Sequence, residues 1–267
     1  VFALVEAARK IGFKSLNVDL IYGLPKQNPQ SFARTLEQVG ELRPDRIALY
    51  GYAHLPERFK SQRRIVRPDL PTAGDKLEML SAAIDSFIDA GYVYVGMDHF
   101  ALPDDALAIA KRQGRLHRNF QGYSTQPDCD LIALGVSAIG RIGGTYSQNA
   151  KTLDEYYDLI DQGLLPIVRG LALSKDDLIR RAVIMAIMCQ GELLFESINN
   201  AWLIDCKQYF AAEFELLRGQ QEEGLVEVLD DCIRVTSKGW FFVRGVALVF
   251  DRYLQAARSR ERFSRII

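Results

Sequence analysis

Hydrophobic positions in the first fifty residues follow two different spacings. A first group recurs at helical intervals, which predicts an amphipathic helix that ends at Gly12. Its members are Phe2, Leu4, Val5, Ala8 and Ile11. Residues 16–22 and 46–52 are β-rich runs, and Asn28-Pro29 supplies the cap and first-turn residue of a helix that should end near residue 42. The expected order is helix, strand, helix, strand.

This order is typical of parallel βα units, either in a barrel or in a doubly wound sheet. Two such units cannot bury both faces of a parallel sheet. No capping residue precedes the first helix. We therefore expect the sequence to begin inside a longer polypeptide whose earlier strands complete the sheet.

The next hundred residues combine regular and irregular stretches. An apolar stripe predicts a long helix over residues 72–90, and residues 92–97 predict a further strand. Pro103-Asp104-Asp105 should cap a short helix that ends near Gln113.

A glycine-rich stretch follows over residues 114–144. An irregular loop of this length in a compact domain is usually functional or disordered. Its aromatic and aliphatic residues argue against disorder, so we expect a functional loop. Thr152 to Glu155 then has the sequence of a capping box, which predicts a helix over residues 156–162.

The pattern changes near residue 171, where helices become dominant. The expected elements are a helix capped by Ser174 and Asp177, a helix over 204–217, strands over 225–229 and 232–235, and a helix over 239–254. Helices followed by a small hairpin and a helix resemble a winged-helix arrangement. We therefore predict two domains, residues 1–170 and 171–267.

Composition narrows the class of protein. Among 267 residues, 48% are hydrophobic, 25% are charged and the formal net charge is −1. Such a balance creates no global field that would attract nucleic acid or an anionic membrane. No apolar run reaches the roughly 18–20 residues that span a bilayer, and no signal peptide is visible. We expect a soluble cytoplasmic protein.

Four cysteines, Cys129, Cys189, Cys206 and Cys232, are scattered without C-x-x-C spacing. Secreted domains usually show patterned pairs, so reduced thiols in the cytosol are the better interpretation. The last three lie among apolar neighbours and should be buried and inert. The sequence therefore predicts no metal site among them.

Asp19 is the first candidate for chemistry. The pattern places it near the C-terminal end of a parallel strand, where the ligands of βα barrels collect. A carboxylate there could accept hydrogen bonds from a ribose or an amino group. An aspartate satisfied by turn amides is an equally weighted alternative.

Two basic segments form a second candidate. The first contains Arg58, Lys60, Arg63, Arg64 and Arg67, and the second contains Lys111, Arg112, Arg115, His117 and Arg118. Solvated surface is the more common role of such runs. The alternative is a funnel for a substrate with several carboxylates, because guanidinium groups pair with carboxylates in bidentate fashion. Nucleic acid is less attractive, since acidic residues occur throughout.

The histidines and the winged-helix-like end carry weaker signals. His54, His99 and His117 are too few and too spread for a metal site. His99 ends a predicted strand, where a polar active-site role is open, although a hydrogen-bonded structural histidine is the more common case. The candidate recognition helix and its exit are rich in glutamate, whereas a surface that faces phosphates needs the opposite charge. We interpret this end as a packing or lid domain.

Several blocks of sequence resemble one known family, the radical S-adenosylmethionine enzymes of the oxygen-independent coproporphyrinogen III oxidase group. The blocks are residues 17–27 (NVDLIYGLPKQ), 52–56 (YAHLP), 96–105 (GMDHFALPDD), 116–125 (LHRNFQGYST) and 262–267 (RFSRII). The blocks at 96–105 and 116–125 resemble the true oxidases, whereas the related haem-chaperone paralogues lack them. The resemblance extends from end to end.

This resemblance implies the last strands of a partial (βα)6 radical S-adenosylmethionine barrel, followed by a mainly helical C-terminal domain. It implies an adenosyl radical, formed from S-adenosylmethionine at a [4Fe-4S] cluster, that abstracts a hydrogen from a propionate. The propionate then loses carbon dioxide and becomes a vinyl group. Two propionates of coproporphyrinogen III react to give protoporphyrinogen IX in haem biosynthesis. The cluster's three-cysteine motif is absent from these residues, so this chain alone should be inactive.

The resemblance also implies roles for individual residues. Asp19, Ala53 and Ile139 match family positions that contact S-adenosylmethionine, and Phe120 and Gln121 match positions implicated in catalysis. The first basic segment and Arg118 are our own candidates for holding the substrate's carboxylates. The implied partners are the porphyrinogen and an electron-donor protein, with a monomeric enzyme and neither nucleic acid nor membrane.

Two other functions remain open from the residues. A haem-binding chaperone would bind haem tightly without turnover, although the two oxidase-like blocks argue against it. A DNA-binding regulator would use the winged-helix-like end, although the charge of that end argues against it.

Overall fold

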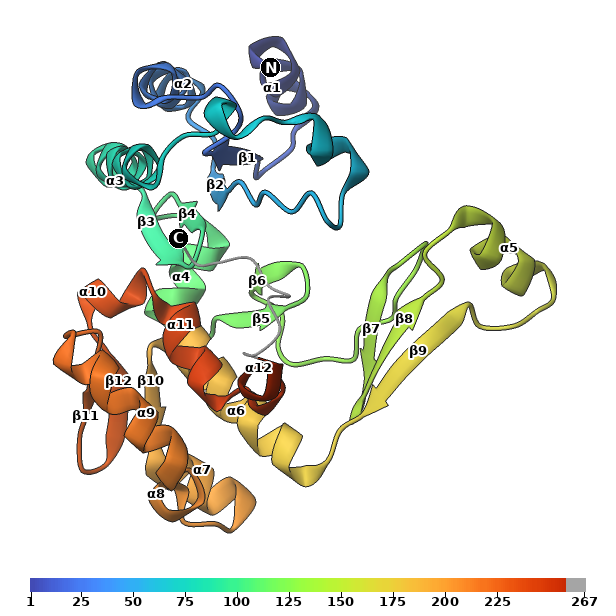
Figure 1. The fold of residues 1–267 in the computed structure, drawn as a ribbon, viewed down its shortest axis with the longest axis vertical. Coiled ribbons are helices and arrows are strands. Elements are labelled where there is room, and N and C mark those ends of the chain that lie inside the picture. The colour runs from blue at the N-terminus through green and yellow to red at the C-terminus, as the bar shows by residue number, and fades with distance from the viewer. Residues whose placement is uncertain (258–267) are drawn as a thin grey trace. The chain divides into compact units, whose positions relative to one another are not determined.

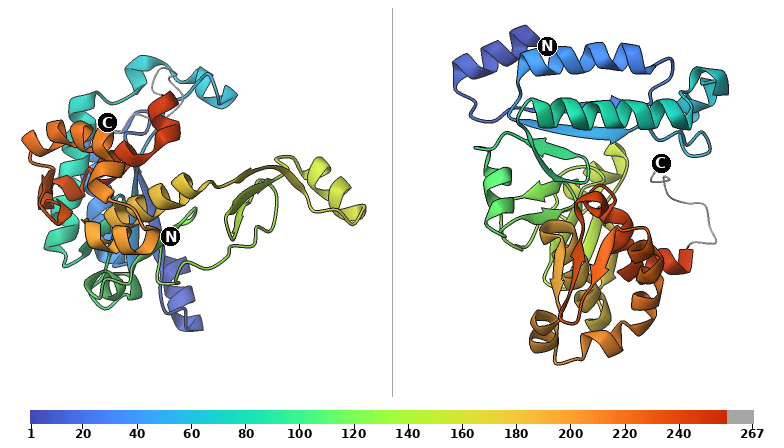
Figure 2. Two further views of the ribbon diagram at one scale, coloured as in Figure 1. Left: turned by 90° about the horizontal axis from the view of Figure 1, so that it is seen from below. Right: turned by 90° about the vertical axis from the view of Figure 1, so that its left-hand side faces the viewer.

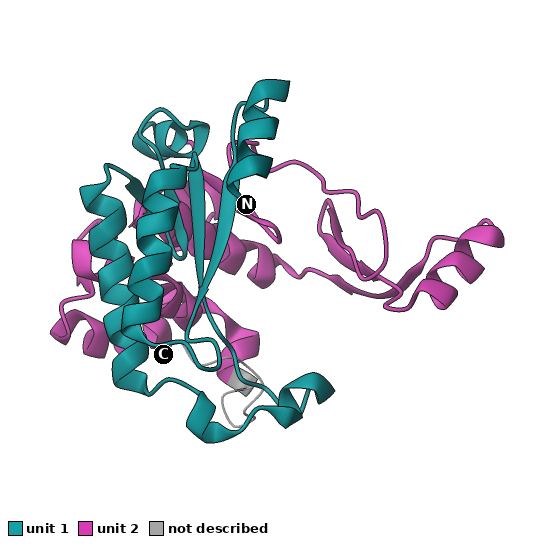
Figure 3. Cartoon of the chain, turned by 90° about the horizontal axis from the view of Figure 1, so that it is seen from above, with its two compact units in different colours: residues 1–113, 256–267 teal, residues 114–255 magenta. Residues whose placement is uncertain are grey.

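The structure is a computed structural model that describes residues 1–257, with side chains to residue 255. The block at 262–267 lies outside the described residues. The chain forms two compact units, residues 1–113 with 256–267, and residues 114–255 (Figure 3). The domain boundary predicted from the sequence, between residues 170 and 171, is a different division. It falls inside the second unit, and we retain it as a proposal about the domains of the family.

The first unit alternates helices and strands in its first half, as predicted (Figure 1). Its elements are α1 (Phe2–Ile11), β1 (Asn17–Tyr22), α2 (Pro29–Leu42), β2 (Arg46–Gly51), the 3₁₀ turns η1 (Lys60–Arg64) and η2 (Arg67–Asp69), α3 (Ala73–Asp89), β3 (Val93–Gly96), β4 (His99–Ala101) and α4 (Ala106–Arg112).

The sheet of this unit has the order β1-β2-β4-β3. β1 and β2 are parallel, with Asp19 opposite Ala48, which confirms the predicted βα units. The strand predicted over residues 92–97 is β3, and the chain turns back after it at Met97, whose φ is +50°. The returning strand β4 pairs antiparallel with both β3 and β2. The sheet is therefore mixed and open, as in the end of a partial barrel.

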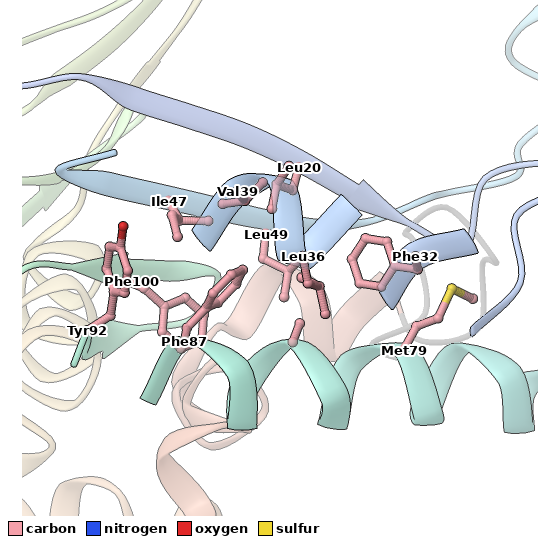
Figure 4. Close-up of a cluster of buried hydrophobic side chains, with 11 residues drawn as sticks. Leu20, Phe32, Leu36, Val39, Ile47, Leu49, Met79, Phe87, Tyr92 and Phe100 are labelled. Atoms are coloured by element: carbon pink, nitrogen blue, oxygen red, sulfur yellow. The ribbon is translucent and has the colours of Figure 1, made fainter. Parts of the chain in front are cut away.

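Helices α2 and α3 cover one face of this sheet. Leu20 on β1 and Ile47 and Leu49 on β2 point to this face, where the helices supply their own apolar stripes (Figure 4). The helix residues in this core are Phe32, Leu36, Val39, Met79, Ala83 and Phe87. Full burial of a Leu, Ile, Val, Phe or Met side chain stabilises the folded protein by about 1.5–3 kcal/mol. The apolar face of the strands is therefore committed to the core, and the opposite face remains available for a functional site.

Capping explains where these helices begin. The side chain of Asn28 accepts a hydrogen bond from the Ser31 amide (2.8 Å), and Pro29 occupies the first turn of α2. Thr72 and Asp75 form the matching capping box of α3. Helix α1 ends at Gly12 with φ +100°, as predicted, but none of its residues is buried within the described chain.

The second unit contains three small sheets and most of the helices. Its elements are β5 (His117–Asn119), β6 (Gly122–Ser124), β7 (Ile139–Ile142), β8 (Thr145–Asn149), α5 (Leu153–Asp161), β9 (Ile167–Ala172), α6 (Lys175–Gln190), β10 (Glu192–Leu194), α7 (Phe195–Trp202), α8 (Cys206–Tyr209), α9 (Ala211–Glu222), β11 (Val226–Val228), β12 (Cys232–Val235), α10 (Ser237–Trp240), α11 (Val243–Ala247) and the 3₁₀ turn η3 (Leu248–Phe250). The helix α12 (Arg252–Ala257) ends the described chain.

The glycine-rich stretch predicted as a loop contains three strands. β5 and β6 form a hairpin, and β7 pairs with β8, which in turn pairs with β9. Figure 2 shows β7, β8 and β9 as a curved ribbon with α5 at the end away from α6. These strands are three to six residues long, so they carry too few side chains for periodicity to reveal them.

The C-terminal part has the predicted winged-helix-like hairpin, β11 and β12, with β10 added at the other edge of β12. The capping box of Ser174 and Asp177 on α6 is confirmed. The helix predicted over residues 204–217 is divided at Phe210, and the one over 239–254 is divided into four short turns. Both predictions of a continuous helix were wrong, because apolar spacing persists across breaks in the backbone.

One capping prediction was also wrong. Thr152 occupies the N-cap position of α5, but its side chain makes no capping hydrogen bond. Helix α7 was not predicted at all. Within residues 1–257, no helix combines the length and apolar composition needed to cross a bilayer.

Candidate functional site

The face of the first sheet opposite α2 and α3 carries the candidate Asp19. Exposure alternates along β1, so Asn17, Asp19 and Ile21 are exposed while Leu20 is buried. The Asn17 side chain donates a hydrogen bond to the Asp19 carboxylate (2.7 Å between Nδ2 and Oδ1). Asp19 lies in the middle of β1, three residues before its end, which corrects the placement at the C-terminal end of the strand. Its carboxylate is nevertheless open for a ligand.

Register places a second polar residue on the same face. Ala48 is the partner of both Asp19 on β1 and His99 on β4, and directly paired residues point to the same side of a sheet. His99 is half-buried and meets the Tyr50 ring edge-on, with 6.3 Å between ring centroids. Asp19, Tyr50 and His99 therefore share one side of the sheet, opposite the apolar core.

Ala53 follows β2 by two residues, in a loop that one glutamine fixes. The Gln62 side chain donates to the Ala53 carbonyl (3.1 Å) and accepts from the Leu55 amide (2.5 Å). At the end of β1, Gln27 does the same for its own loop, accepting from the Leu24 amide (3.0 Å). A glutamine side chain thus fixes the backbone of the loop after each strand. Neither glutamine was singled out from the sequence.

The basic segment predicted for substrate carboxylates occupies this loop and η1. All five cations are exposed, and Arg63 donates to the Pro56 carbonyl (3.0 Å). The members are Arg58, Lys60, Arg63, Arg64 and Arg67. They lie in the loop after β2, in η1 and at the start of η2, and their side chains are exposed.

The second basic segment is not one continuous charged surface. Lys111 points inward and donates to the Tyr94 carbonyl (2.6 Å), and burial lowers its pKa to about 8. Arg112 donates to the Pro103 carbonyl (2.8 Å). In the second unit, the Arg118 guanidinium lies over the Tyr123 ring (5.6 Å to its centroid) and its Nε is buried.

Phe120 and Gln121 form the two-residue turn of the β5–β6 hairpin. The Asn119 side chain accepts a hydrogen bond from the Gln121 amide (2.8 Å), and Gly122 follows with φ +121°. The base of the hairpin is anchored on α6, where the Tyr123 hydroxyl donates to the Met188 carbonyl (2.8 Å). Phe120 is 55% exposed although it is a large aromatic residue.

A hollow of about 270 Å³ lies beside this turn. Its lining brings together three residues that were proposed separately from the sequence, Phe120, Gln121 and Ile139. The other lining residues are Leu131, Ile132, Ala133, Leu134, Ser137 and Ala138. The hollow is slightly smaller than most complete small-molecule sites, which usually enclose about 300–1,000 Å³.

The loop that lines the hollow is held by a buried side chain, Asn149, which is 2% exposed. Its amide nitrogen donates to the carbonyls of Ala133 (3.3 Å) and Gly135 (2.9 Å), and its backbone amide donates to Ala138 (3.0 Å). Sequence reasoning missed this residue, because an isolated asparagine in a polar stretch carries no signal of burial.

The predicted site residues thus form two groups. Asp19, Ala53 and the first basic segment belong to the first unit, and Phe120, Gln121, Ile139 and Arg118 belong to the second. Within the second unit the hollow unites three of them.

The cysteines are unsuited to metal binding. Cys189, Cys206 and Cys232 are buried, and burial raises the pKa of Cys189 to about 12 and of Cys206 to about 11. Thiols with such pKa values stay protonated at neutral pH, whereas the thiolate is the metal ligand. Across the described part of the chain, no group of three His, Cys, Asp or Glu side chains is placed to hold a metal ion.

Comparison with known proteins gives consistent matches. A family model described as "HemN C-terminal domain" matches residues 173–242. The chain is 49% identical over 267 residues to the oxygen-independent coproporphyrinogen III oxidase of Salmonella typhimurium, and 51% identical over 264 residues to that of Pseudomonas aeruginosa. It covers 58% and 57% of those proteins. A relative from Thermostichus vulcanus with the same name is 42% identical, and the chain covers 82% of it.

A solved structure, "Coproporphyrinogen III oxidase (HemN) from Escherichia coli is a Radical SAM enzyme", matches with a TM-score of 0.92 and 49% identity. The match covers 94% of this chain and 58% of that one. The chain therefore spans a little over half the length of most of these relatives.

Proposed function

Because this chain belongs to the oxygen-independent coproporphyrinogen III oxidase family, we propose that the protein containing it decarboxylates two propionates of coproporphyrinogen III to vinyl groups. The product is protoporphyrinogen IX: each reacting propionate loses its carboxyl group as carbon dioxide and one hydrogen from the neighbouring chain carbon, and its two remaining carbons become the vinyl group. One of the two electrons removed leaves with that hydrogen, and the other passes to an electron acceptor. S-adenosylmethionine and a [4Fe-4S] cluster supply the radical chemistry when bound. The chain's own residues bind, orient and shield the reactants.

The residues present fit S-adenosylmethionine. Asp19 offers an exposed carboxylate that can accept hydrogen bonds from hydroxyl or ammonium groups. The hollow offers an apolar wall from Ile139 and an aromatic ring from Phe120, together with the amide of Gln121, a combination suited to a purine ring and its polar edge. We propose that Asp19, Ala53 and Ile139 contact S-adenosylmethionine, and that Phe120 and Gln121 act beside the reacting carbon.

The first basic segment fits a substrate with four carboxylates. Its five exposed cations follow β2 directly, around the loop that holds Ala53. Guanidinium groups pair with carboxylates through two parallel hydrogen bonds, so a few of these residues could hold the propionates that do not react. Arg118 is a weaker candidate, because its guanidinium already lies over Tyr123.

The cluster does not fit the described residues of this chain, whose buried thiols are held protonated. We propose that its ligands belong to the additional length that most relatives possess. An electron-donor protein would reduce the cluster, and we propose a monomeric enzyme of the cytoplasm, where unpaired cysteines such as these remain reduced.

The observation that carries the proposal is the hollow itself. Phe120 and Gln121 on one hairpin and Ile139 on another strand are separated by about twenty residues, yet they line the same space. This arrangement supports a common ligand, since Ile139 and the pair Phe120 and Gln121 were proposed as site residues before the structure placed them beside one space.

The full-length protein, with its cluster reconstituted without oxygen, should convert coproporphyrinogen III to protoporphyrinogen IX when S-adenosylmethionine and a reductant are added. Carbon dioxide release and chromatography of the oxidised porphyrins measure this. Asp19→Ala should weaken S-adenosylmethionine binding, whereas Asp85→Asn, an exposed position on α3, should not. Tight haem binding without any turnover would instead identify a haem chaperone.

A further inference from the structure

Arg181 on α6 does not line the hollow, but its side chain contacts two residues, Asp128 and Tyr146, that are in turn linked to residues of the lining. Its guanidinium holds both oxygens of Asp128 (2.7 and 2.8 Å) and donates through Nε to the Tyr146 hydroxyl (3.1 Å). Helix α6 also carries the base of the β5–β6 hairpin. One rigid helix therefore supports both the hairpin and the residues beside it.

From Tyr146 the contact continues to the turn. The ring of Tyr146 on β8 meets the ring of Phe120 edge-on, with 5.4 Å between centroids and an interplanar angle of 82°. Aromatic pairs favour this geometry, and it restricts where an exposed ring can lie. Phe120 lies in the turn of the β5–β6 hairpin, so its contact with Tyr146 restricts the movement of that turn.

A second set of contacts links Asp128 to Leu131, another residue that lines the hollow. Arg141 on β7 donates to the same carboxylate (2.7 Å) and to the Cys129 carbonyl (2.8 Å). The backbone of Arg141 exchanges hydrogen bonds with Leu131, which lines the hollow (2.7 and 2.9 Å). A single carboxylate thus joins α6 to the loop beside Leu131.

The charges within this cluster reinforce one another. Burial alone would lower the pKa of Arg181, but hydrogen bonds to Asp128 and Tyr146 outweigh it and raise the pKa. Burial would raise the pKa of Asp128, but its hydrogen bond to Arg181 and the charges of Arg181, Arg141 and His117 lower it. The pKa shifts of Asp128 and Arg181 both favour the charged forms at neutral pH, so this ion pair is a fixed support and not a titrating switch.

We propose that Arg181 is a positioning residue of the reaction, which acts through Tyr146 on Phe120 and through Asp128 on the wall at Leu131. This inference rests on the proposed function for its catalytic meaning, but its structural content stands without it. A planar guanidinium is required, since a lysine cannot hold two carboxylate oxygens and a hydroxyl in fixed directions.

Kinetics of the full-length, cluster-loaded protein test the catalytic part. Arg181→Gln should lower kcat by about 10- to 100-fold, as expected for a small displacement of a group near the reacting atoms. KM for S-adenosylmethionine should rise by a smaller factor, because Phe120 and Leu131 also line the hollow proposed for it. More S-adenosylmethionine should be consumed per carbon dioxide released, because a displaced Phe120 leaves the reactants poorly aligned. Arg181→Lys should recover only part of the loss.

A double-mutant cycle tests the route. Tyr146→Phe keeps the ring but removes the hydroxyl that accepts from Arg181, and should be mildly impaired; Tyr146→Leu removes the ring and should resemble Arg181→Gln. The double variant with Arg181→Gln and Tyr146→Leu should lose less activity than the sum of the two single losses, because both substitutions break the contact between Arg181 and Tyr146, while Arg181→Gln alone also removes the contact with Asp128. Additive losses, or an unchanged ratio of S-adenosylmethionine to carbon dioxide in Arg181→Gln, would overturn the proposal.

Amide hydrogen exchange provides a reading that needs no turnover. In Arg181→Gln, the amides of Phe120 and Gln121 should exchange faster, while those of β11 and β12 should not change. Arg234→Gln is the matched control, since it breaks an arginine–glutamate pair of similar length (2.9 Å) on β12. Unchanged exchange at the turn contradicts the positioning role, whereas a wild-type protein without turnover contradicts only the proposed function.

Discussion

Single polar side chains decide the shape of the backbone around the hollow. Asn149 is the clearest case, because it is 2% exposed and its amide satisfies two carbonyls of one loop. A buried carbonyl that loses its partner costs more than the lost bond itself. The loop that carries Ser137 and Ala138 to the hollow therefore depends on a residue that touches no ligand.

We expect Asn149→Asp to destabilise the protein by about 1–3 kcal/mol, because the carboxylate cannot donate to the carbonyls of Ala133 and Gly135. Urea unfolding measures this free energy. Gln148→Glu is the control, since Gln148 is more exposed and donates to the single carbonyl of Ser137 (3.0 Å). Equal effects of the two substitutions would show that the buried amide has no special role.

Lys111 gives a second prediction at this scale. Its pKa is lowered by burial from 10.5 to about 8, so between these values the unfolded chain binds a proton that the folded protein has released. Below pH 8 the amine is charged in both states, and the folded protein carries the full penalty of burying that charge. As the pH rises from about 8 to 10.5 this penalty is relieved, so the free energy of unfolding should increase.

Removing the amine should remove this contribution. The difference in unfolding free energy between wild type and Lys111→Met should grow in favour of wild type as the pH is raised from 8 to 10, measured by urea unfolding at each pH. Lys14→Met changes an exposed lysine and should give a difference that stays constant. A constant difference for Lys111→Met as well would mean that this amine is solvated.

At the scale of elements, capping side chains and short hydrogen-bonded turns set the boundaries. Thr72 and Asp75 satisfy the free amides at the start of α3, whereas Thr152 has the same sequence context before α5 and makes no such bond. The two positions look alike in the sequence. Only the backbone around Thr152 decides that its hydroxyl is not used.

This pair offers a matched test. Thr72→Ala should cost about 0.5–2 kcal/mol of unfolding free energy, the usual range for a lost N-cap, whereas Thr152→Ala should cost little. Thermal or urea unfolding of both variants measures the difference. If Thr152→Ala proved as costly as Thr72→Ala, the local structure assigned to the start of α5 would be incorrect.

At the scale of the whole molecule, the chain contains the residues proposed to contact S-adenosylmethionine, whereas its described residues offer no group of three side chains that could hold a metal ion. Its relatives from Salmonella typhimurium and Pseudomonas aeruginosa are longer, and it covers 58% and 57% of them. Asp19, Ala53 and Ile139 are the proposed contacts to S-adenosylmethionine. The proposed activity therefore belongs to the full-length protein.

Accordingly, the 267-residue chain alone should take up no stable cluster when incubated with iron and sulfide without oxygen. Three of its four thiols are buried, and the pKa values of Cys189 and Cys206 are raised to about 12 and about 11. Iron analysis and visible absorption check this, with the full-length protein as the positive control. About four irons per chain, together with a cluster spectrum, would contradict it.

The sequence alone determined the elements that carry long or strongly marked patterns. The parallel strands β1 and β2, the capped helices α2, α3 and α6, and the hairpin of β11 and β12 all follow from periodicity and capping residues. The family also followed from the sequence, because blocks such as residues 17–27 and 116–125 combine several residue types in a fixed order. Local chemistry suffices where neighbours in sequence determine the outcome.

The tertiary structure decided everything that depends on residues distant in sequence. The order of β4 between β2 and β3, the clamp of Asn149 on the loop at residues 133–138, and the contact of Arg181 with Asp128 join positions that local patterns cannot relate. The same holds for the hollow, where Phe120 and Ile139 meet only because two separate hairpins bring them together. Hydrogen bonds and packing between distant segments are set by the fold as a whole, since each needs a partner that the local sequence does not specify.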